Sequence, residues 1–452
     1  MNLSQRDRAV IWHPFTPQKQ MPDPIAVVKG AGEFLYDDQG NEYIDAISSW
    51  WVTLHGHAHP KIAEALYKQA STIEQVIFAG FTHEPAVQLA ENLLPLLPGT
   101  FHKIFYSDNG STSTEVAIKM SLQYWWNVNK EGGTRNEEGG SKKDPVSKGA
   151  ADSGGERNEE ERGRRTKVLA FNNSYHGDTF GAMSVSDRSV FTLAFQEKLF
   201  EVVFIDPPKK GDSLPDLNWK EFACFIYEPL VQGAGCMQFY EKDGLNALLS
   251  KCKEHQVICI ADEVMTGFHR TGKLFASEYL AHTPDIICLS KGLTGGTMAL
   301  GVTACVERIY QAFVTDDKLK TFFHGHSFTA NPLACTAAVT SLELLQDSDC
   351  VARIERICKA NTEFISSIKS DEAFVHTKNH RQLGTILAFE ITSGKDEYLN
   401  SIGTTITKLA LEKGVFIRPL GNTVYIMPPY CISEESLKKV YEVLREVVRS
   451  VR

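Results

Sequence analysis

Long apolar runs are absent from this sequence. No stretch of the 452 residues approaches the ~18 consecutive apolar residues of a membrane-spanning helix. The amino-terminal segment MNLSQRDRAVIWHPF also lacks the apolar centre, ~7–15 residues long, of a secretory signal. We therefore expect no membrane partner and a protein that remains in the cytoplasm.

Cysteine pairs are absent too. The chain has 10 cysteines, but none belongs to a CxxC motif, and several lie within apolar runs such as VICIAD and DIICLS. Spacing of this kind is typical of buried, reduced thiols and also favours the cytosol.

The sequence also has no excess of basic residues. It contains 47 Lys and Arg and 56 Asp and Glu, which gives a formal net charge of −9. Binding to a nucleic-acid backbone needs clustered basic residues, so we expect no nucleic-acid partner. The composition, 42% hydrophobic and 23% charged, is that of a globular protein. At roughly 100–200 residues per domain, the length fits two or more domains, or one large unit with an appendage.

Residues 130–165 lack the means to form a core. This segment has no aromatic residue, one branched aliphatic residue (Val146), and nine acidic against nine basic side chains. We expect a disordered surface insertion rather than a docking segment, and assign it no chemistry.

Short apolar runs alternate with helical patterns through the middle of the chain. Each run ends in a polar residue followed by turn-forming residues, which is typical of strands buried on both faces of a largely parallel sheet. The sequence therefore predicts an α/β core. The predicted strands lie within KIFYSDNG, KVLAFNNSYHG, VVFIDPP, ACFIYEP, VICIADE and DIICLSKG.

The carboxyl-terminal part has a different pattern. GTILAFE and TVYIMPP resemble strands of a smaller layer, and an amphipathic helix follows Ser433, a plausible cap, with apolar residues at 437, 440, 441, 444, 447, 448 and 451. We expect a smaller α+β domain built from both termini. The predicted division is 1–55 and 326–452 for this small domain, and 56–325 for the large domain.

Three charged residues follow predicted strands, at the sheet edge where such folds bind ligands: Glu228, Asp262 and Lys291. Each alone could be an ordinary charge at the end of a strand. Together they place an amine near a carboxylate. Pyridoxal phosphate would use both, because a lysine can bind its aldehyde and a buried Asp262 would keep the pyridine nitrogen protonated.

The phosphate of such a cofactor needs donors, and SDNGSTSTEVAIKM offers them where a strand runs into a helix. Gly110 permits close backbone approach, Ser111 and Thr112 add hydroxyls, and the helix start adds N–H groups. A plain capped helix start is the alternative interpretation. HGHAHP could suggest a metal, but no Cys or carboxylate cluster completes a site, so we expect no metal.

These blocks, together with SSWWVTLHGHAHP, FNNSYHGDTFGAMSVSD, YEPLVQGAG, IADEVMTGFHRTGKLFA, HGHSFTANPLAC and IRPLGN, closely resemble the class III, fold type I aminotransferases. The resemblance spans essentially the whole chain except 130–165. It implies a pyridoxal-phosphate enzyme with a large domain around a mostly parallel seven-stranded sheet. The SSWW and SYHGDTFGAMS blocks point to the branch that converts 8-amino-7-oxononanoate to 7,8-diaminononanoate in biotin synthesis.

The resemblance assigns the cofactor contacts residue by residue. Lys291 matches the lysine that binds the aldehyde and acts as general base, and Asp262 the partner of the pyridine nitrogen. Val264 and Tyr175 would contact the two faces of the ring, with Tyr175 also facing substrate. Gly110 and Ser111 match the phosphate cup. Gly325 and Ser327 would complete it from a neighbouring subunit, which implies a homodimer with shared active sites.

The resemblance also assigns the substrate pocket. Trp50 matches its wall, although paired tryptophans are more often core residues, and Arg418 matches the arginine that holds the substrate carboxylate. Asp178, Arg270 and Glu228 would lie in the same region, where structural ion pairs are an equal alternative.

Two departures concern the amino donor and the phosphate cup. HPFT replaces HPYT, so Phe15 stands where members that use S-adenosylmethionine have a tyrosine; S-adenosylmethionine and lysine both remain possible donors. HGHS replaces HGPT, which places His326 beside Ser327. Two other functions stay open: an ω-aminotransferase acting on ornithine, 4-aminobutyrate or another amine, and a pyridoxal-phosphate-binding protein without turnover.

Overall fold

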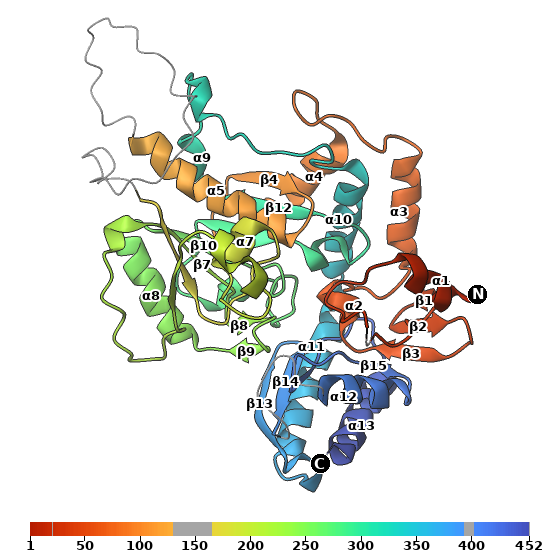
Figure 1. Ribbon diagram of the computed structural model, residues 1–452. Helices are drawn as coiled ribbons and strands as arrows, with labels where there is room; N and C mark the ends of the chain where they lie inside the picture. Colours follow the sequence, from red (N-terminus) through yellow and green to blue (C-terminus); the bar gives the residue numbers. More distant parts are fainter. Residues whose placement is uncertain (20, 130–164, 393–401, 452) are drawn as a thin grey trace, which may run out of the picture.

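The computed structural model describes residues 1–19, 21–129, 165–392 and 402–451 (Figure 1). Nearly all of the segment predicted as an insertion lies outside these ranges. Across the described ranges, no helix has both the length and the apolar character needed to cross a membrane.

Seven strands form the central sheet, and only β12 runs antiparallel to its neighbours. This confirms the predicted α/β fold, and all six apolar runs of the sequence contribute a strand. The seventh, β12, is not among the predicted strands. The order across the sheet is β4 (Lys103–Ser107), β12 (Gly301–Cys305), β11 (Ile286–Leu289), β10 (Ile258–Asp262), β7 (Phe222–Tyr227), β5 (Lys167–Phe171) and β6 (Val203–Ile205).

The sheet is buried on both faces. Leu169 and Phe171 of β5 pack in one hydrophobic cluster with Leu245 of α8 (Lys242–Glu254). Their neighbours Val168 and Ala170 pack in another, with side chains of α5 (Gly110–Asn129). Successive strand residues point to opposite faces, so a strand covered on both sides is apolar throughout.

Further helices surround the large sheet, and α10 packs against both α3 and α4 (Figure 1). These helices are α3 (Pro60–Ala70), α4 (Glu84–Leu93), α7 (Phe180–Val185), α9 (Glu307–Gln311) and α10 (Pro332–Leu345). The short 3-10 helices are η1 (Leu94–Leu96), η2 (Leu193–Lys198), η3 (Trp219–Glu221), η4 (Ala276–Tyr279), η5 (Lys291–Thr294), η6 (Lys318–Lys320) and η7 (Glu372–Phe374). A hairpin joins β8 (Val231–Gln232) to β9 (Gln238–Phe239).

Both termini contribute to the smaller layer, as predicted. After α1 (Leu3–Val10), the strands β1 (Val27–Ala31), β2 (Phe34–Asp37) and β3 (Glu42–Asp45) form a sheet with β15 (Val415–Phe416). The pairing of β3 with β15 is parallel and joins Ile44 to Val415. A short irregular helix, α2 (Ser48–Trp51), then leads towards the large sheet.

A second small sheet completes the carboxyl-terminal part (Figure 1). It consists of β13 (Thr377–Leu383), β14 (Ile386–Ile391) and β16 (Thr423–Ile426), all antiparallel, with helices α11 (Ser348–Ile368), α12 (Ile402–Leu411) and α13 (Glu434–Ser450). Ser433 caps α13 by accepting a hydrogen bond from the amide of Ser436 at 3.1 Å. The domain boundaries at 55 and 325 stay predictions.

Candidate active site

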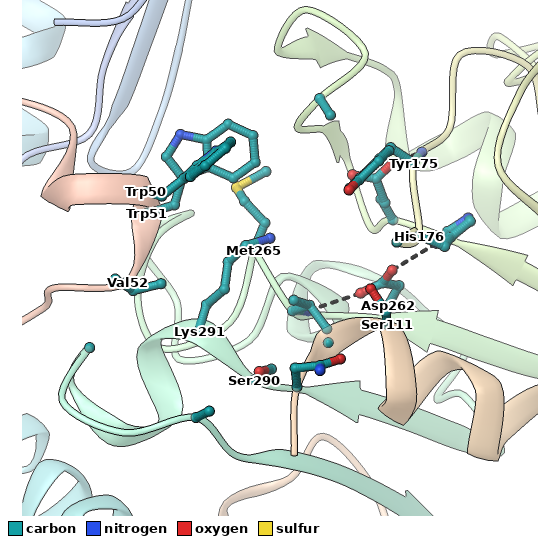
Figure 2. A pocket seen from close by; sticks show the side chains of 18 of the residues that line it. Trp50, Trp51, Val52, Ser111, Tyr175, His176, Asp262, Met265, Ser290 and Lys291 are labelled. Atoms are coloured by element: carbon teal, nitrogen blue, oxygen red, sulfur yellow. Dashed lines mark hydrogen bonds and ion pairs between the residues drawn. The ribbon is translucent and has the colours of Figure 1, made fainter. Parts of the chain in front are cut away.

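A cavity of about 540 Å³ lies at the carboxyl edge of the large sheet, where segments from both termini meet it. Residues that follow β4, β5, β7, β10 and β11 all reach it, because parallel strands end at the same edge. Figure 2 shows the labelled side chains around this space. The predicted site residues that line it are Phe15, Trp50, Gly110, Ser111, Tyr175, Glu228, Asp262, Val264, Lys291 and Arg418.

Asp262 is the last residue of β10 and is 4% exposed. Its Oδ2 atom accepts a hydrogen bond from Nδ1 of His176 at 2.7 Å, and its Oδ1 atom accepts one from the amide of Val264 at 3.0 Å (Figure 2). A carboxylate oxygen can accept more than one hydrogen bond. Asp262 can therefore keep both partners and still receive a donor from the cavity.

His176 lines the cavity and contacts Asp262, but it is not among the residues predicted from the sequence. It is buried, and its own amide donates to Oγ of Ser186 at 2.8 Å, which fixes its backbone. The imidazole orients the Asp262 carboxylate towards the cavity. Its place in SYHGD, directly after Tyr175, was the only available signal, since its partner lies 86 residues further along the chain.

Lys291 opens η5 with a φ of 44°, a left-handed conformation that is strained for a residue with a side chain. Its amine lies 5.0 Å from the ring centre of Trp51, towards which it points in Figure 2. Burial lowers the pKa of the Lys291 amine, while the negative charges of Asp262 and Glu228 act in the opposite direction. The neutral, nucleophilic form is therefore favoured more than for an exposed lysine.

Glu228 follows β7 and is 5% exposed. Its two carboxylate oxygens accept hydrogen bonds from different loops, Oε1 from the amide of Tyr175 at 3.0 Å and Oε2 from the amide of Gly233 at 2.8 Å. Burial raises the pKa of Glu228 to about 7, and the charge of Asp262 adds to this effect. Glu228 thus joins two loops that border the cavity.

The start of α5 provides a cradle for an anionic group. The amides in the first turn of a helix have no carbonyl partner within it and can bind a phosphate. A Cβ atom on Gly110 would lie 2.7 Å from Cγ1 of Val264, so only glycine fits there without displacement. The Oγ atom of Ser111 accepts a hydrogen bond from the amide of Asp178 at 3.2 Å. This bond connects the loop after β5 to the start of α5.

Aromatic side chains and one cation surround the mouth of the cavity. The ring centres of Phe15 and Trp50 are 5.6 Å apart, and the guanidinium of Arg418 lies 4.7 Å from the ring centre of Trp50. Phe191, which was not predicted as a site residue, packs between two aromatic rings. Its ring centre lies 5.9 Å from that of Phe15 and 5.8 Å from that of Tyr175. Arg418 is exposed, so its charge is available to a substrate anion.

Five predicted residues do not line this cavity: Thr112, Asp178, Arg270, Gly325 and Ser327. The hydroxyl of Thr112 accepts a hydrogen bond from the amide of Asn109 at 3.0 Å, at the start of α5. Asp178 instead accepts a hydrogen bond from the hydroxyl of Tyr175 at 2.8 Å. Arg270 is 1% exposed and donates to the carbonyls of Pro428 at 3.0 Å and Trp51 at 3.4 Å, so it lies behind the wall. Gly325 and Ser327 are exposed.

Two of the three histidines of HGHAHP form hydrogen bonds, and they do so with different partners. His55 bonds Oγ of Ser341 at 3.0 Å, and His57 donates to Asp45 at 2.9 Å. Within the part of the chain that the structure describes, no group of three or more His, Cys, Asp or Glu residues is arranged around a metal position.

The residues present fit pyridoxal phosphate. Lys291 supplies an amine, Asp262 an oriented carboxylate, and the start of α5 a cradle that a Cβ atom on Gly110 would fill. These groups face one cavity. An aldehyde, a pyridine nitrogen and a phosphate each find a chemically suitable partner there.

Comparison with known proteins places the whole chain in one family. The sequence profile of the family "Aminotransferase class-III" matches residues 15–448. The chain is 41% identical to a protein of Synechococcus elongatus named adenosylmethionine-8-amino-7-oxononanoate aminotransferase, over 98% of this chain and 99% of that protein.

Solved structures agree. The crystal structure of adenosylmethionine-8-amino-7-oxononanoate aminotransferase from Methanocaldococcus jannaschii has a TM-score of 0.85 and 31% identity, with 99% of each chain covered. An omega transaminase from Pseudomonas jessenii, solved in complex with PMP, has a TM-score of 0.84 over 100% of this chain and 99% of its own. At 21% identity, the latter likeness concerns the fold alone.

Proposed function

Because the chain belongs to the class III aminotransferases, we propose that it transfers an amino group to the keto carbon of 8-amino-7-oxononanoate and so forms 7,8-diaminononanoate for biotin synthesis. The observation that carries this proposal is that Lys291, Asp262, Trp50 and Arg418 face a single cavity. Relatives of 41% and 31% identity over nearly their whole length bear the name of this activity.

Pyridoxal phosphate is the cofactor of this family and supplies an electron-accepting ring that stabilises negative charge on the reacting carbon. Lys291 would hold the aldehyde when no substrate is bound. Asp262, bonded to His176, would hold a proton on the pyridine nitrogen and so maintain the electron-accepting character of the ring. The start of α5, with Gly110 and Ser111, would hold the phosphate.

Lys291 would act as the base once a donor amine occupies its place. Its Nζ atom would take up the α-proton of the donor and release it again during the transfer, and it would serve the acceptor in the reverse direction. The lowered pKa of this amine suits the role, since a lysine at its ordinary pKa would be protonated near neutrality.

Arg418 and Trp50 would receive the acceptor. The planar guanidinium of Arg418 can bind the carboxylate of 8-amino-7-oxononanoate through two hydrogen bonds, and Trp50 offers an apolar wall for its hydrocarbon chain. Both side chains line the same cavity as Lys291, so one bound molecule could reach all three.

S-adenosylmethionine is the donor we propose, with lysine as the second candidate. The names of the relatives support the first. Phe15 supports the second, because its ring borders the mouth without the hydroxyl that a tyrosine would present there.

A donor panel tests both parts of the proposal. The purified holoenzyme is given each amine alone, and conversion of the bound aldehyde to the amine form is followed by absorbance. 8-Amino-7-oxononanoate is then added and 7,8-diaminononanoate is measured by mass spectrometry. Production from S-adenosylmethionine or lysine would support the proposal. Turnover of ornithine or 4-aminobutyrate with no product from 8-amino-7-oxononanoate would replace it with the ω-aminotransferase alternative.

We propose further that the enzyme is a cytoplasmic homodimer. The exposed position of Gly325 and Ser327 in the single chain supports contribution to a partner's site. The free state of all 10 cysteines supports a reducing compartment. Sedimentation or light scattering of the holoenzyme would measure the oligomeric state.

A further inference from the structure

The turn that carries Trp50 and Trp51 has an unusual backbone. Ser48, Ser49 and Trp51 have φ values of 52°, 59° and 67°, which L-residues with side chains rarely adopt. Ser49 combines its positive φ with a ψ of −86°, and Trp50 is also non-helical. Three such residues within four positions persist only where surrounding contacts enforce them.

Several of the enforcing contacts are made by Asp45, the last residue of β3, while Oγ of Ser48 donates a hydrogen bond to the carbonyl of Met427 at 2.8 Å. The side chain of Asp45 has no exposed surface. Its Oδ2 atom accepts hydrogen bonds from the amide of Ser49 at 2.6 Å and from the hydroxyl of Ser49 at 3.1 Å. The same atom accepts a hydrogen bond from Nε2 of His57 at 2.9 Å, and Oδ1 accepts a hydrogen bond from the amide of Ile47 at 3.3 Å.

The turn connects this buried carboxylate to the cavity. Trp51 faces the amine of Lys291 at 5.0 Å and donates its indole N–H to the hydroxyl of Tyr425 at 2.9 Å. Trp50 faces Arg418 and Phe15 at the mouth. Figure 2 shows both indoles presented from the same short segment. Any relaxation of the turn would move both rings, one beside the reacting amine and one beside the substrate wall.

We propose that Asp45 is a positioning residue for substrate recognition: its buried carboxylate holds the strained turn that places Trp50 and Trp51 in the cavity. Asp45 does not line the cavity and has no part in the chemistry itself. The inference rests on the proposed function, since it assigns Trp50 to the substrate wall. It adds a residue outside the cavity on which the shape of that wall depends.

The chain offers a matched control in Asp37. This residue ends β2, one strand away in the same sheet, and is also buried. Like Asp45, it accepts hydrogen bonds from backbone amides of the turn that follows. The donors are the amides of Gln39 at 3.0 Å and Asn41 at 2.8 Å. Its turn carries no cavity residue. Asp37→Asn therefore reproduces the general loss of a buried carboxylate without affecting the tryptophans.

The experiment compares Asp45→Asn with Asp37→Asn in the holoenzyme by two readouts. For Asp45→Asn we expect amide hydrogen exchange in the peptide spanning 46–54 to accelerate at least about tenfold. We also expect the KM for 8-amino-7-oxononanoate to rise about fivefold or more, with a smaller change in kcat and retained cofactor absorbance. For Asp37→Asn we expect neither quantity to change.

Unchanged exchange and KM in a folded Asp45→Asn enzyme would overturn the proposal, as would equal changes in Asp37→Asn. If Asp45→Asn does not fold, Ser49→Ala removes one donor to Asp45 and should change both readouts in the same direction by less; no change would overturn the proposal. If the wild-type enzyme fails to convert 8-amino-7-oxononanoate, the proposed function is wrong, while the exchange comparison still decides whether Asp45 holds the turn.

Discussion

At the scale of single residues, burial changes the charge states of the cavity groups. Loss of hydration lowers the pKa of Lys291 and raises that of Glu228, so both groups are shifted towards their neutral forms. His176 and the amide of Val264 both donate hydrogen bonds to the carboxylate of Asp262. The site thus combines a nucleophilic amine with an oriented carboxylate, which the proposed transfer requires.

Replacing Lys291 by alanine should abolish transfer. The variant lacks both the amine that holds the aldehyde and the base that moves the proton, so we expect activity to fall by at least about a thousandfold. The visible absorbance of the covalently held cofactor should also disappear. Lys103→Ala is the matched control, since Lys103 also lies over an aromatic ring, that of Tyr310 at 5.4 Å, but outside the cavity. A Lys291→Ala enzyme that retained activity would refute the assignment.

Glu228 should make stability depend on pH. Its pKa is about 7 when folded against an ordinary 4.5, so the folded state binds the proton more tightly. This contribution is complete below pH 4.5 and is lost as the pH rises towards 7. The loss amounts to about 3 kcal/mol at most, at 1.36 kcal/mol per pKa unit.

Denaturant unfolding of wild type and Glu228→Gln over this pH range would measure the effect. The free energy of unfolding of the variant, relative to wild type, should rise with pH, because glutamine has no proton to lose. Glutamine also cannot accept both amides through its NH₂ group, so a constant offset is expected in addition. A difference that stays constant with pH would contradict the raised pKa.

At the scale of elements, the site depends on where strands end and helices begin. β10 ends in Asp262, β11 leads into the turn of Lys291, and α5 begins at Gly110 immediately beside Val264. Two hydrogen bonds hold the loop after β5. The amide of Tyr175 donates to Glu228, and the amide of Asp178 donates to Oγ of Ser111. The cofactor cradle is therefore a junction of several elements.

Gly110→Ala tests this junction. The new Cβ atom would lie 2.7 Å from Cγ1 of Val264, so the helix start and Val264 must separate. We expect the affinity for pyridoxal phosphate to fall by about tenfold, corresponding to about 1.4 kcal/mol, in titrations of the apoenzyme. Val264→Ala removes the clashing methyl groups, so the double variant should recover part of the loss. Equal affinity in wild type and Gly110→Ala would show that the contact has room to relax.

At the scale of the whole molecule, the active site combines distant parts of the chain. Phe15 and Trp50 come from the amino-terminal segment, Arg418 from near the carboxyl terminus, and the chemical groups from the large sheet. The parallel pairing of β3 with β15 brings the two ends together. Gly325 and Ser327 lie outside this cavity, which agrees with the proposal that they serve a second subunit.

Hybrid dimers test the shared site. Lys291→Ala and a Gly325→Val/Ser327→Ala variant should each be nearly inactive as pure dimers. In a hybrid, one of the two sites combines an intact Lys291 with an intact loop from the other subunit. After unfolding and refolding together, random pairing should restore about a quarter of wild-type activity. No recovery in hybrids whose formation has been verified would contradict a loop that acts across the interface.

The sequence by itself determined the fold class, most of the central sheet and the charged residues that line the cavity at its edge. The strands of this sheet are apolar on both faces, and Asp262 and Lys291 follow such runs directly, so local patterns sufficed. The strand β12 was missed because GVTAC has one large aliphatic residue, Val302, among smaller ones. The family resemblance added Trp50 and Arg418, which no local pattern distinguishes from ordinary core or surface residues.

Only the tertiary structure decided the contacts between residues far apart in the chain. It paired His176 with Asp262, placed Phe191 between Phe15 and Tyr175, and moved Arg270 from the cavity to the carbonyls behind it. It also showed that the strained turn of Trp50 and Trp51 is hydrogen-bonded to the buried Asp45. Periodicity and propensity report how a residue relates to its neighbours in sequence, whereas these contacts depend on how sheets and helices pack, which no single segment encodes.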